Sequence, residues 1–265
     1  MKIARILLED EVHYARPLDI QGMVMEILTG DPFQGVHPTG RSVTEFILLS
    51  PMVPAAILCV GLNYRRHAAE MGAKIPKYPV LFIKNPSSLL DPGASIAIPK
   101  KLASTKVDYE GEMAVVIGKT CRNVTRENAM DYVLGFTAAN DVSARDWQKD
   151  WGGSQWCRGK SFDTFCPLGP WIVTRDEISN PIALRIKTRV NGEVLQDSNT
   201  ADMIFDVPTL IEFLSGDTTL AAGTVILTGT PEGVGVGRTP TRWLQSGDSV
   251  SVEIEGIGCL QNGVV

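Results

Sequence analysis

Three carboxylates in the chain have the types and spacing needed to bind a divalent cation. Glu110 and Glu112 lie two residues apart within residues 107–118, which we expect to form one strand, and Asp141 follows a second predicted strand. Side chains alternate between the faces of a strand, so both glutamates should project from one face, with Asp108 close behind. Carboxylate oxygens favour Mg²⁺, Mn²⁺ or Ca²⁺ over Zn²⁺ and copper. The alternative interpretation is a solvated face of an antiparallel sheet that binds no ion.

Such a site would suit a small acid that carries a ketone beside a carboxylate. An octahedral cation takes about six ligands, so three monodentate carboxylates leave about three positions for water or substrate. A 2-oxo acid can offer a carboxylate oxygen and a ketone oxygen to these positions. The cation would then act as a Lewis acid that stabilises an enolate.

A histidine and a glutamate could supply the proton-transfer group. Residues 63–72 read as a short helix, with Asn63 as its N-cap and Gly72 at its end. His67 and Glu70 are then three residues apart and share a face, and a carboxylate beside an imidazole makes a general base. Loops with glycine and proline on both sides could let this helix move as a lid. The alternative is an ordinary ion pair on a surface helix.

Several cationic side chains could bind substrate carboxylates or stabilise developing negative charge. The candidates are Lys84, Lys160 and Arg145, although each could equally be a surface charge. A Gly- and Trp-rich loop at 147–156 is expected to shape the pocket around the substrate's tail. The cysteines have no matched histidine partner, so a thiol nucleophile is not expected.

Composition narrows the class of protein. The chain has 265 residues, of which 44% are hydrophobic and 21% charged, and its net charge is −5. These values are ordinary for a globular protein, and the absence of a strong basic field argues against nucleic acid and anionic membranes as partners. No stretch is apolar and long enough to span a bilayer. Five scattered cysteines without a secretory leader predict reduced thiols and a cytoplasmic location.

The pattern of short apolar runs and turns predicts a β-rich α+β fold. Glycine and proline are frequent, at 25 and 16 residues, and Asn191-Gly192 is a strong hairpin signal. A proline-containing passage near residue 53 suggests a boundary. We therefore expect a small β-rich N-terminal subdomain, 1–53, and a larger catalytic domain, 54–265.

Four separated motifs resemble the fumarylacetoacetate hydrolase family, in the order that this family has them. They are Asp-Tyr-Glu-Gly-Glu at 108–112, Asn-Asp-Val-Ser-Ala-Arg-Asp at 140–146, Gly-Lys-Ser-Phe-Asp-Thr at 159–164 and Leu-Thr-Gly-Thr-Pro-Glu-Gly-Val-Gly at 227–235. The resemblance extends from about residue 55 to the end of the sequence. Residues 140–170 are most similar to the branch called fumarylacetoacetate hydrolase domain-containing protein 2 and its bacterial relatives.

The resemblance implies a fold, an assembly and roles for residues. It implies a mixed β-sandwich roll, a homodimer and a site for Mg²⁺ or Mn²⁺. The matching metal ligands are Glu110, Glu112 and Asp141, the active-site lysine is Lys160, the lid dyad is His67 and Glu70, and the substrate-side positions are Lys84, Arg145, Gln148 and Thr230. The founding hydrolase has a further aspartate ligand before its catalytic histidine, where this chain reads Leu62-Asn63-Tyr64. The chain thus resembles the three-carboxylate members and is not expected to process fumarylacetoacetate itself.

Members of this family hydrolyse C–C bonds of acylpyruvates, decarboxylate oxaloacetate, or tautomerise oxaloacetate between enol and keto forms. All three reactions pass through a metal-bound enolate. We expect a Mg²⁺-dependent enzyme acting on short 2-oxo or β-diketo acids, with C–C hydrolysis ranked first and the oxaloacetate tautomerase or decarboxylase as alternatives. A hypothesis from another class is a protein on the same fold that binds metal and carboxylates without catalysis.

Overall fold

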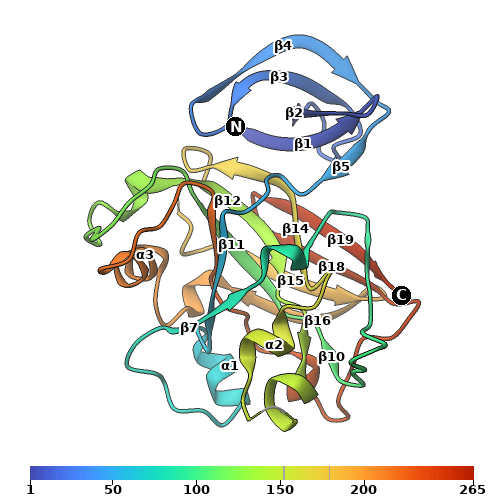
Figure 1. Ribbon diagram of the computed structural model, residues 1–265, viewed down its shortest axis with the longest axis vertical. Coiled ribbons are helices and arrows are strands. Elements are labelled where there is room, and N and C mark those ends of the chain that lie inside the picture. The colour runs from blue at the N-terminus through green and yellow to red at the C-terminus, as the bar shows by residue number, and fades with distance from the viewer. Residues whose placement is uncertain (152, 179) are drawn as a thin grey trace.

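The structure is a computed structural model that describes residues 1–151, 153–178 and 180–265. Gly152, part of the predicted Gly- and Trp-rich loop, lies outside the described residues. The fold is β-rich with a few short helices, which confirms the predicted α+β class (Figure 1). No helix among the described residues combines the length and the apolar composition that crossing a membrane requires.

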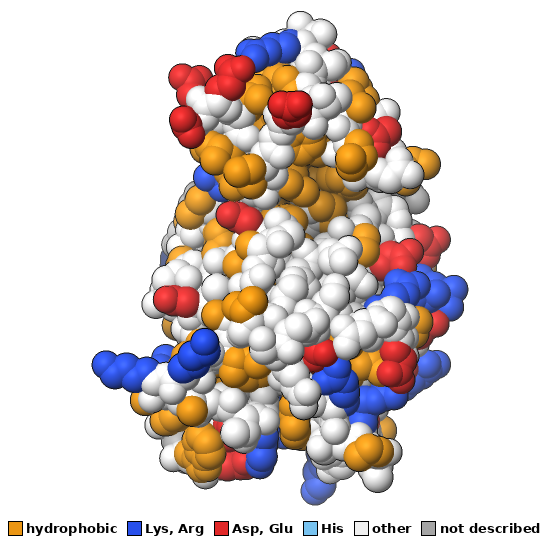
Figure 2. Space-filling view, turned by 90° about the vertical axis from the view of Figure 1, so that its right-hand side faces the viewer, with side chains coloured by type: hydrophobic (Ala, Val, Ile, Leu, Met, Phe, Trp, Pro, Cys, Tyr) orange, Lys and Arg blue, Asp and Glu red, His pale blue; other side chains and the backbone are white. Residues whose placement is uncertain are grey.

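The N-terminal strands form an antiparallel layer at one end of the molecule (Figure 1). They are β1 (Lys2–Leu8), β2 (Glu11–Pro17), β3 (Met25–Asp31), β4 (Gly35–Val43) and β5 (Ile47–Leu49). β1 also pairs with β14 (Cys166–Thr174), so this layer continues into the large sheet of the body. Figure 2 shows hydrophobic side chains in the hollow beneath the layer. A groove of the structure is lined by Ile20, Leu48 and Trp171. The division at residue 53 stays a prediction.

The large sheet carries the segments that build the pocket. From β14 its order continues through β12, β11, β17 and β6 to β7, with β8 beside β14. Their bounds are β6 (Ala56–Gly61), β7 (Val80–Lys84), β8 (Leu89–Leu90), β11 (Gly111–Ile117), β12 (Val133–Asn140) and β17 (Thr224–Leu227). β6 and β17 run parallel, so both strands finish at the same end of the sheet, and the segments that follow them start there.

A second sheet packs against the first. Its strands, in spatial order, are β16 (Glu193–Asn199), β15 (Arg185–Val190), β18 (Ser249–Ile254), β19 (Gly258–Val264) and β9 (Ser95–Ile96). Met113 and Phe136 of the large sheet share one hydrophobic core with Val252 and Leu260 of the second sheet. The turn between β15 and β16 has positive φ at Asn191 and Gly192, which confirms the predicted hairpin.

Helices are short and lie outside the sheets. The α-helices are α1 (Arg65–Glu70), α2 (Trp156–Lys160) and α3 (Val207–Ser215). The single helical turns are η1 (Pro86–Ser88), η2 (Ala129–Tyr132), η3 (Asp146–Asp150), η4 (Thr200–Asp202) and η5 (Gly235–Gly237). In Figure 1, α1 and α2 lie at the end of the molecule opposite the N-terminal strands.

Two local predictions were wrong in detail. Residues 107–118 form two strands, because β10 (Val107–Asp108) pairs with β13 (Ser143–Ala144) while β11 pairs with β12. Asn63 does not cap α1: the cap is Tyr64, without a side-chain hydrogen bond. The Asn63 amide instead donates to the carbonyls of Phe205 and Thr228, which ties the start of the helix to distant segments.

We predict that Asp206→Ala lowers the free energy of unfolding by about 1 kcal/mol, because the Asp206 carboxylate caps α3. It accepts hydrogen bonds from the Thr209 amide and hydroxyl at 3.0 and 2.6 Å. Partial burial alone would raise the pKa of Asp206, but the Thr209 hydrogen bonds and Arg126 lower it. The cap therefore stabilises the protein above the ordinary carboxyl range, and this stabilisation is lost as pH falls through the lowered pKa. Urea unfolding measures the loss; Asp206→Asn keeps the acceptor and should lose less.

Candidate active site

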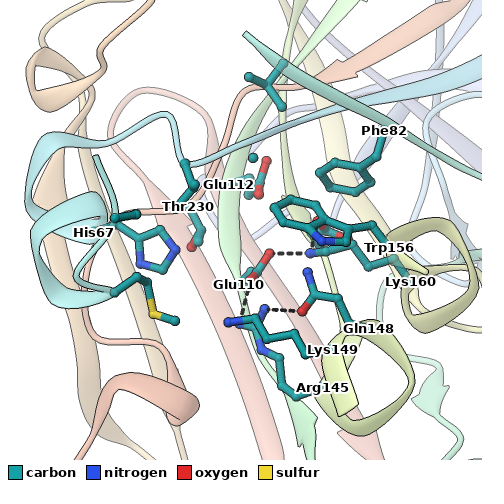
Figure 3. Close-up of a pocket in the computed structure, with 16 residues that line it drawn as sticks. His67, Phe82, Glu110, Glu112, Arg145, Gln148, Lys149, Trp156, Lys160 and Thr230 are labelled. Atoms are coloured by element: carbon teal, nitrogen blue, oxygen red, sulfur yellow. Dashed lines mark hydrogen bonds and ion pairs between the residues drawn. The ribbon is translucent and has the colours of Figure 1, made fainter. Parts of the chain in front are cut away.

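One cavity, of about 150 Å³, is lined by residues from the end of β6, from the segment after β17, from α1 and α2, and from β11 (Figure 3). The cavity is lined by these predicted site residues: His67, Glu110, Glu112, Asp141, Arg145, Gln148, Lys160 and Thr230. Glu70 and Lys84 contact this set from outside the cavity wall. The sequence motifs, which are up to about half the chain apart, thus meet in one place.

The three predicted ligands lie close together and are all buried. One carboxylate oxygen from each of Glu110, Glu112 and Asp141 lies within 4.8 Å of the others. The register of β11 and β12 causes this proximity: Gly111 pairs with Asn140, and the Asp141 amide donates to the Glu110 carbonyl at 2.9 Å. Glu110 lies between β10 and β11, yet it still faces the same cavity as Glu112. Because all three carboxylates are buried, they do not form the solvated strand face that was the alternative interpretation.

Two buried lysines bind Asp141. Lys84 donates to Asp141 Oδ1 at 2.6 Å and Lys160 donates to Oδ2 at 2.6 Å. Lys160 also donates to Glu110 Oε2 and to Ser143 Oγ, each at 2.7 Å. The Lys84 side chain is fully buried and does not line the cavity, so its contact is with a carboxylate rather than with the space for a substrate.

Arg145 connects Glu110 to a fourth acid that sequence reasoning left without a role. Its Nη2 lies 2.5 Å from Glu110 Oε1, its Nε donates to Asp108 Oδ2 at 2.9 Å, and its Nη1 donates to Gln148 Oε1 at 3.0 Å. Burial alone would raise the pKa of Glu110, but Arg145 and Lys160 outweigh it and hold the pKa below its usual range. Asp108 is buried and also accepts from the Gly235 amide at 2.7 Å.

Glu112 is the buried acid whose charge is not matched. Among the described residues no lysine or arginine pairs with it; its carboxylate accepts from the Gly229 amide at 2.7 Å. Burial, together with the neighbouring Asp141 and Glu110, raises the pKa of Glu112 well above its usual range. A divalent cation would remove this imbalance, and three carboxylate oxygens are the donor set that Mg²⁺ or Mn²⁺ favours. The residues present therefore fit such an ion.

His67 and Glu70 form the predicted pair on α1. His67 Nδ1 lies 3.0 Å from Glu70 Oε2, and because a carboxylate only accepts hydrogen bonds, Nδ1 carries the proton. Nε2 is then left as the basic nitrogen, and His67 lines the cavity. In the view of Figure 3, His67 and Lys160 flank the Glu110 carboxylate from opposite sides. Glu70 Oε1 accepts from the Gly233 amide at 2.9 Å.

Two aromatic residues form an apolar wall of the cavity. Phe82 and Trp156 meet edge to face with centroids 5.5 Å apart, and both line the cavity. Lys160 Nζ lies 4.9 Å from the centre of the Phe82 ring. Trp156 ends the loop that the sequence predicts to shape the pocket, whereas Phe82 carries no sequence signal beyond its place in an apolar strand. The signal for Asp108 was available, since it is an acid in the same motif as Glu110.

Family models match both parts of the chain. The model described as "Fumarylacetoacetate (FAA) hydrolase C-terminal" matches residues 56–265, and the one described as "Rv2993c-like, N-terminal" matches residues 1–51. The protein named oxaloacetate tautomerase fahd2, mitochondrial, of Xenopus laevis is 50% identical over 230 residues, which cover 86% of this chain and 71% of that protein.

Solved structures extend the match over the whole chain. The 2-hydroxyhepta-2,4-diene-1,7-dioate isomerase from Mycobacterium marinum has a TM-score of 0.87 at 39% identity and covers 100% of this chain and 98% of its own. The fumarylacetoacetate hydrolase from the psychrophilic Exiguobacterium antarcticum has a TM-score of 0.88 at 39% identity, with 100% and 99% covered. With a family model matched along 56–265 and relatives this similar, the chain belongs to the fumarylacetoacetate hydrolase family.

Proposed function

We propose that this protein is an oxaloacetate tautomerase that interconverts the enol and keto forms of its substrate. The observation that carries the proposal is the His67–Glu70 pair at a small cavity that also contains three buried carboxylates. The name of the Xenopus laevis relative supports this reaction over the C–C hydrolysis that sequence reasoning ranked first. Tautomerisation moves one proton between a carbon and an oxygen, so it needs a base and charge stabilisation but no attacking water.

The side chains divide the work as follows. Glu70 holds the Nδ1–H tautomer of His67, so that Nε2 can take the proton from the carbon beside the ketone and pass it to the ketone oxygen, which gives the enol, or carry it from oxygen to carbon in the reverse direction. Arg145 and Gln148 lie on the cavity wall, where they can bind a substrate carboxylate, and Thr230 offers a hydroxyl. Lys84 and Lys160 hold Asp141 in place.

A divalent cation completes the proposal. Glu110, Glu112 and Asp141 would hold Mg²⁺ or Mn²⁺, with Ca²⁺ as a further option for an all-oxygen site. When bound, the ion supplies positive charge that stabilises negative charge developing on a substrate oxygen. The homodimer and the cytoplasmic location stay predictions; the Xenopus laevis relative is named as mitochondrial.

A second function, hydrolysis of acylpyruvates, is favoured by the same His67–Glu70 pair, because a fixed base can also activate water. Decarboxylation of oxaloacetate needs no such base for its C–C cleavage. The three reactions therefore differ in their products, and one assay can separate them.

We expect purified protein with Mg²⁺ to accelerate the conversion of enol-oxaloacetate to the keto form, because base and charge are both in place. The ultraviolet absorbance of the enol follows the rate, and NMR identifies the products with oxaloacetate and with several acylpyruvates. Chelation with EDTA should remove the activity, and Mg²⁺ or Mn²⁺ should restore it. A rate equal to that in buffer alone would exclude the proposal, while pyruvate and CO₂, or cleaved acylpyruvates, would assign the other reactions.

Glu112→Gln should weaken Mn²⁺ binding by at least about tenfold, because it removes one charged ligand. In EDTA the same variant should be at least as stable to heat as the native protein, because it no longer buries an acid that has no cationic partner. Calorimetric titration and thermal unfolding measure the two effects. The exposed Glu127→Gln is the matched control and should change neither. Unchanged Mn²⁺ affinity in Glu112→Gln would contradict the ligand assignment.

His67→Ala should lower kcat/KM for tautomerisation by about 10²- to 10⁴-fold, the range for loss of a general base, and should retain Mn²⁺ affinity. His37→Ala, on the exposed face of β4, is the matched control and should be fully active. Full activity of His67→Ala would show that another group moves the proton.

A further inference from the structure

The Glu70 carboxylate occupies a defined place on the glycine-rich segment that follows β17. Its Oε1 accepts from the Gly233 amide at 2.9 Å, while its Oε2 lies 3.0 Å from His67 Nδ1. Gly233 lies 163 residues after Glu70 in the sequence, so this contact joins two distant parts of the chain. The orientation of His67 therefore depends on where this segment lies.

Gly237, at the end of η5, leaves the space that Glu70 fills. A Cβ added at Gly237 would lie 2.5 Å from Glu70 Cδ, 2.6 Å from its Oε1 and 2.8 Å from its Cγ. These contacts are far shorter than van der Waals separation, so the side chain of Glu70 and any side chain at 237 exclude each other.

The reason for glycine differs between Gly237 and its neighbours. Gly233 has φ of +98° and a Cβ there would lie 2.0 Å from the Leu195 carbonyl oxygen, so its backbone requires glycine. A Cβ at Gly235 would likewise meet the Arg242 carbonyl oxygen at 2.0 Å. Gly237 is outside the left-handed region, and its closest contacts are with the flexible end of Glu70. The backbone at position 237 can therefore accept an alanine, and the added methyl group would displace the Glu70 side chain.

We propose that Gly237 is a positioning residue: the space left by its missing side chain holds the Glu70 carboxylate, which in turn fixes His67 with Nδ1 protonated and Nε2 available to the cavity. The effect on turnover rests on the proposed function, in which His67 is the base. The effect on the imidazole does not, because it follows from the Glu70 contact alone. A carboxylate confined in this way needs no rearrangement when the proton moves, which lowers the barrier.

The same segment also binds Asp108, which contacts Arg145 of the cavity wall. The amides of Gly235 and Val236 donate to Asp108, at 2.7 and 3.1 Å, and Asp108 binds Arg145. The segment 233–237 therefore positions two acids. One is Glu70, which contacts His67, and the other is Asp108, which contacts Arg145. Because the three atoms nearest to a Cβ at Gly237 all belong to Glu70, substitution of Gly237 tests the Glu70 contact separately from the Asp108 contact.

The first test is Gly237→Ala, read by the ring ¹⁵N shifts of His67 in NMR. The chain has 3 histidines, so His67→Ala assigns the signal without ambiguity. In the native protein we expect the Nδ1–H tautomer, and in Gly237→Ala a mixture of tautomers. Gly263→Ala is the matched control: its backbone is also outside the left-handed region, and its Cβ would meet only Ser95 Oγ, at 3.3 Å. A native tautomer in Gly237→Ala would overturn the proposal.

The second test is a double-mutant cycle with Glu70→Ala. Gly237→Ala alone should lower kcat by up to about 100-fold with little change in KM, as expected for a misplaced catalytic group. In the Glu70→Ala background it should have no further effect on kcat or on the melting temperature, because the space is already empty. Additive losses would mean that Gly237 only supports the loop and would overturn the proposal.

The cycle also covers poor folding of the single variant. If Gly237→Ala unfolds and the double variant folds like Glu70→Ala, the mutual exclusion is confirmed; if both unfold, the proposal is overturned. The two levels of inference remain distinguishable. A native protein without tautomerase activity but with the expected tautomer change refutes the proposed function and supports the positioning role. An active native protein whose Gly237→Ala variant keeps native kcat refutes the positioning role alone.

Discussion

The site depends on an imbalance of charge buried in one cluster. Four acids in the cluster have little or no exposure to solvent and are accompanied by three buried cations: Asp108, Glu110, Glu112 and Asp141 face Lys84, Lys160 and Arg145. Desolvation costs several kcal/mol for each ion, and partners recover this only where the geometry is good. Asp108, Glu110 and Asp141 have such partners, whereas Glu112 has one backbone amide. Glu112 is thus the acid of the cluster that lacks a cationic partner among the described residues, and it lies where an ion would bind.

The surrounding strands and helices bury the cluster and fix the relative positions of its side chains. The pairing of β11 with β12 brings Glu110 and Asp141 together, and β7 and α2 deliver the two lysines. Phe82 and Trp156 cover the cluster on the apolar side. Low polarity around paired charges strengthens their interaction, so the apolar wall and the ion pairs reinforce each other.

Sequence reasoning predicted which residues come together better than it predicted the contacts among them. Alternation along a strand was enough to place Glu110 and Glu112 on one side, and helical spacing was enough to pair His67 with Glu70, since both rules are local. The contact of Lys84 with Asp141, the role of Asp108 behind Arg145, and the space at Gly237 all join segments far apart in sequence. No local pattern reports such contacts. The single predicted strand at 107–118 was wrong for the same reason, because its first two residues pair in a different sheet from the longer strand that follows.

The parallel pairing of β6 with β17 has a consequence for how the protein folds. α1 follows β6 and the glycine-rich segment follows β17, so Glu70 and Gly233 become neighbours only after these two strands have paired across the sheet. Contacts between such distant residues carry a large loop-closure entropy and form slowly. The Glu70 carboxylate therefore gains its Gly233 contact only when these two strands are in place. A chain caught in a partly folded state could retain most of its secondary structure and still lack the Glu70–Gly233 contact, which makes this contact a more demanding measure of native topology than helix or strand content.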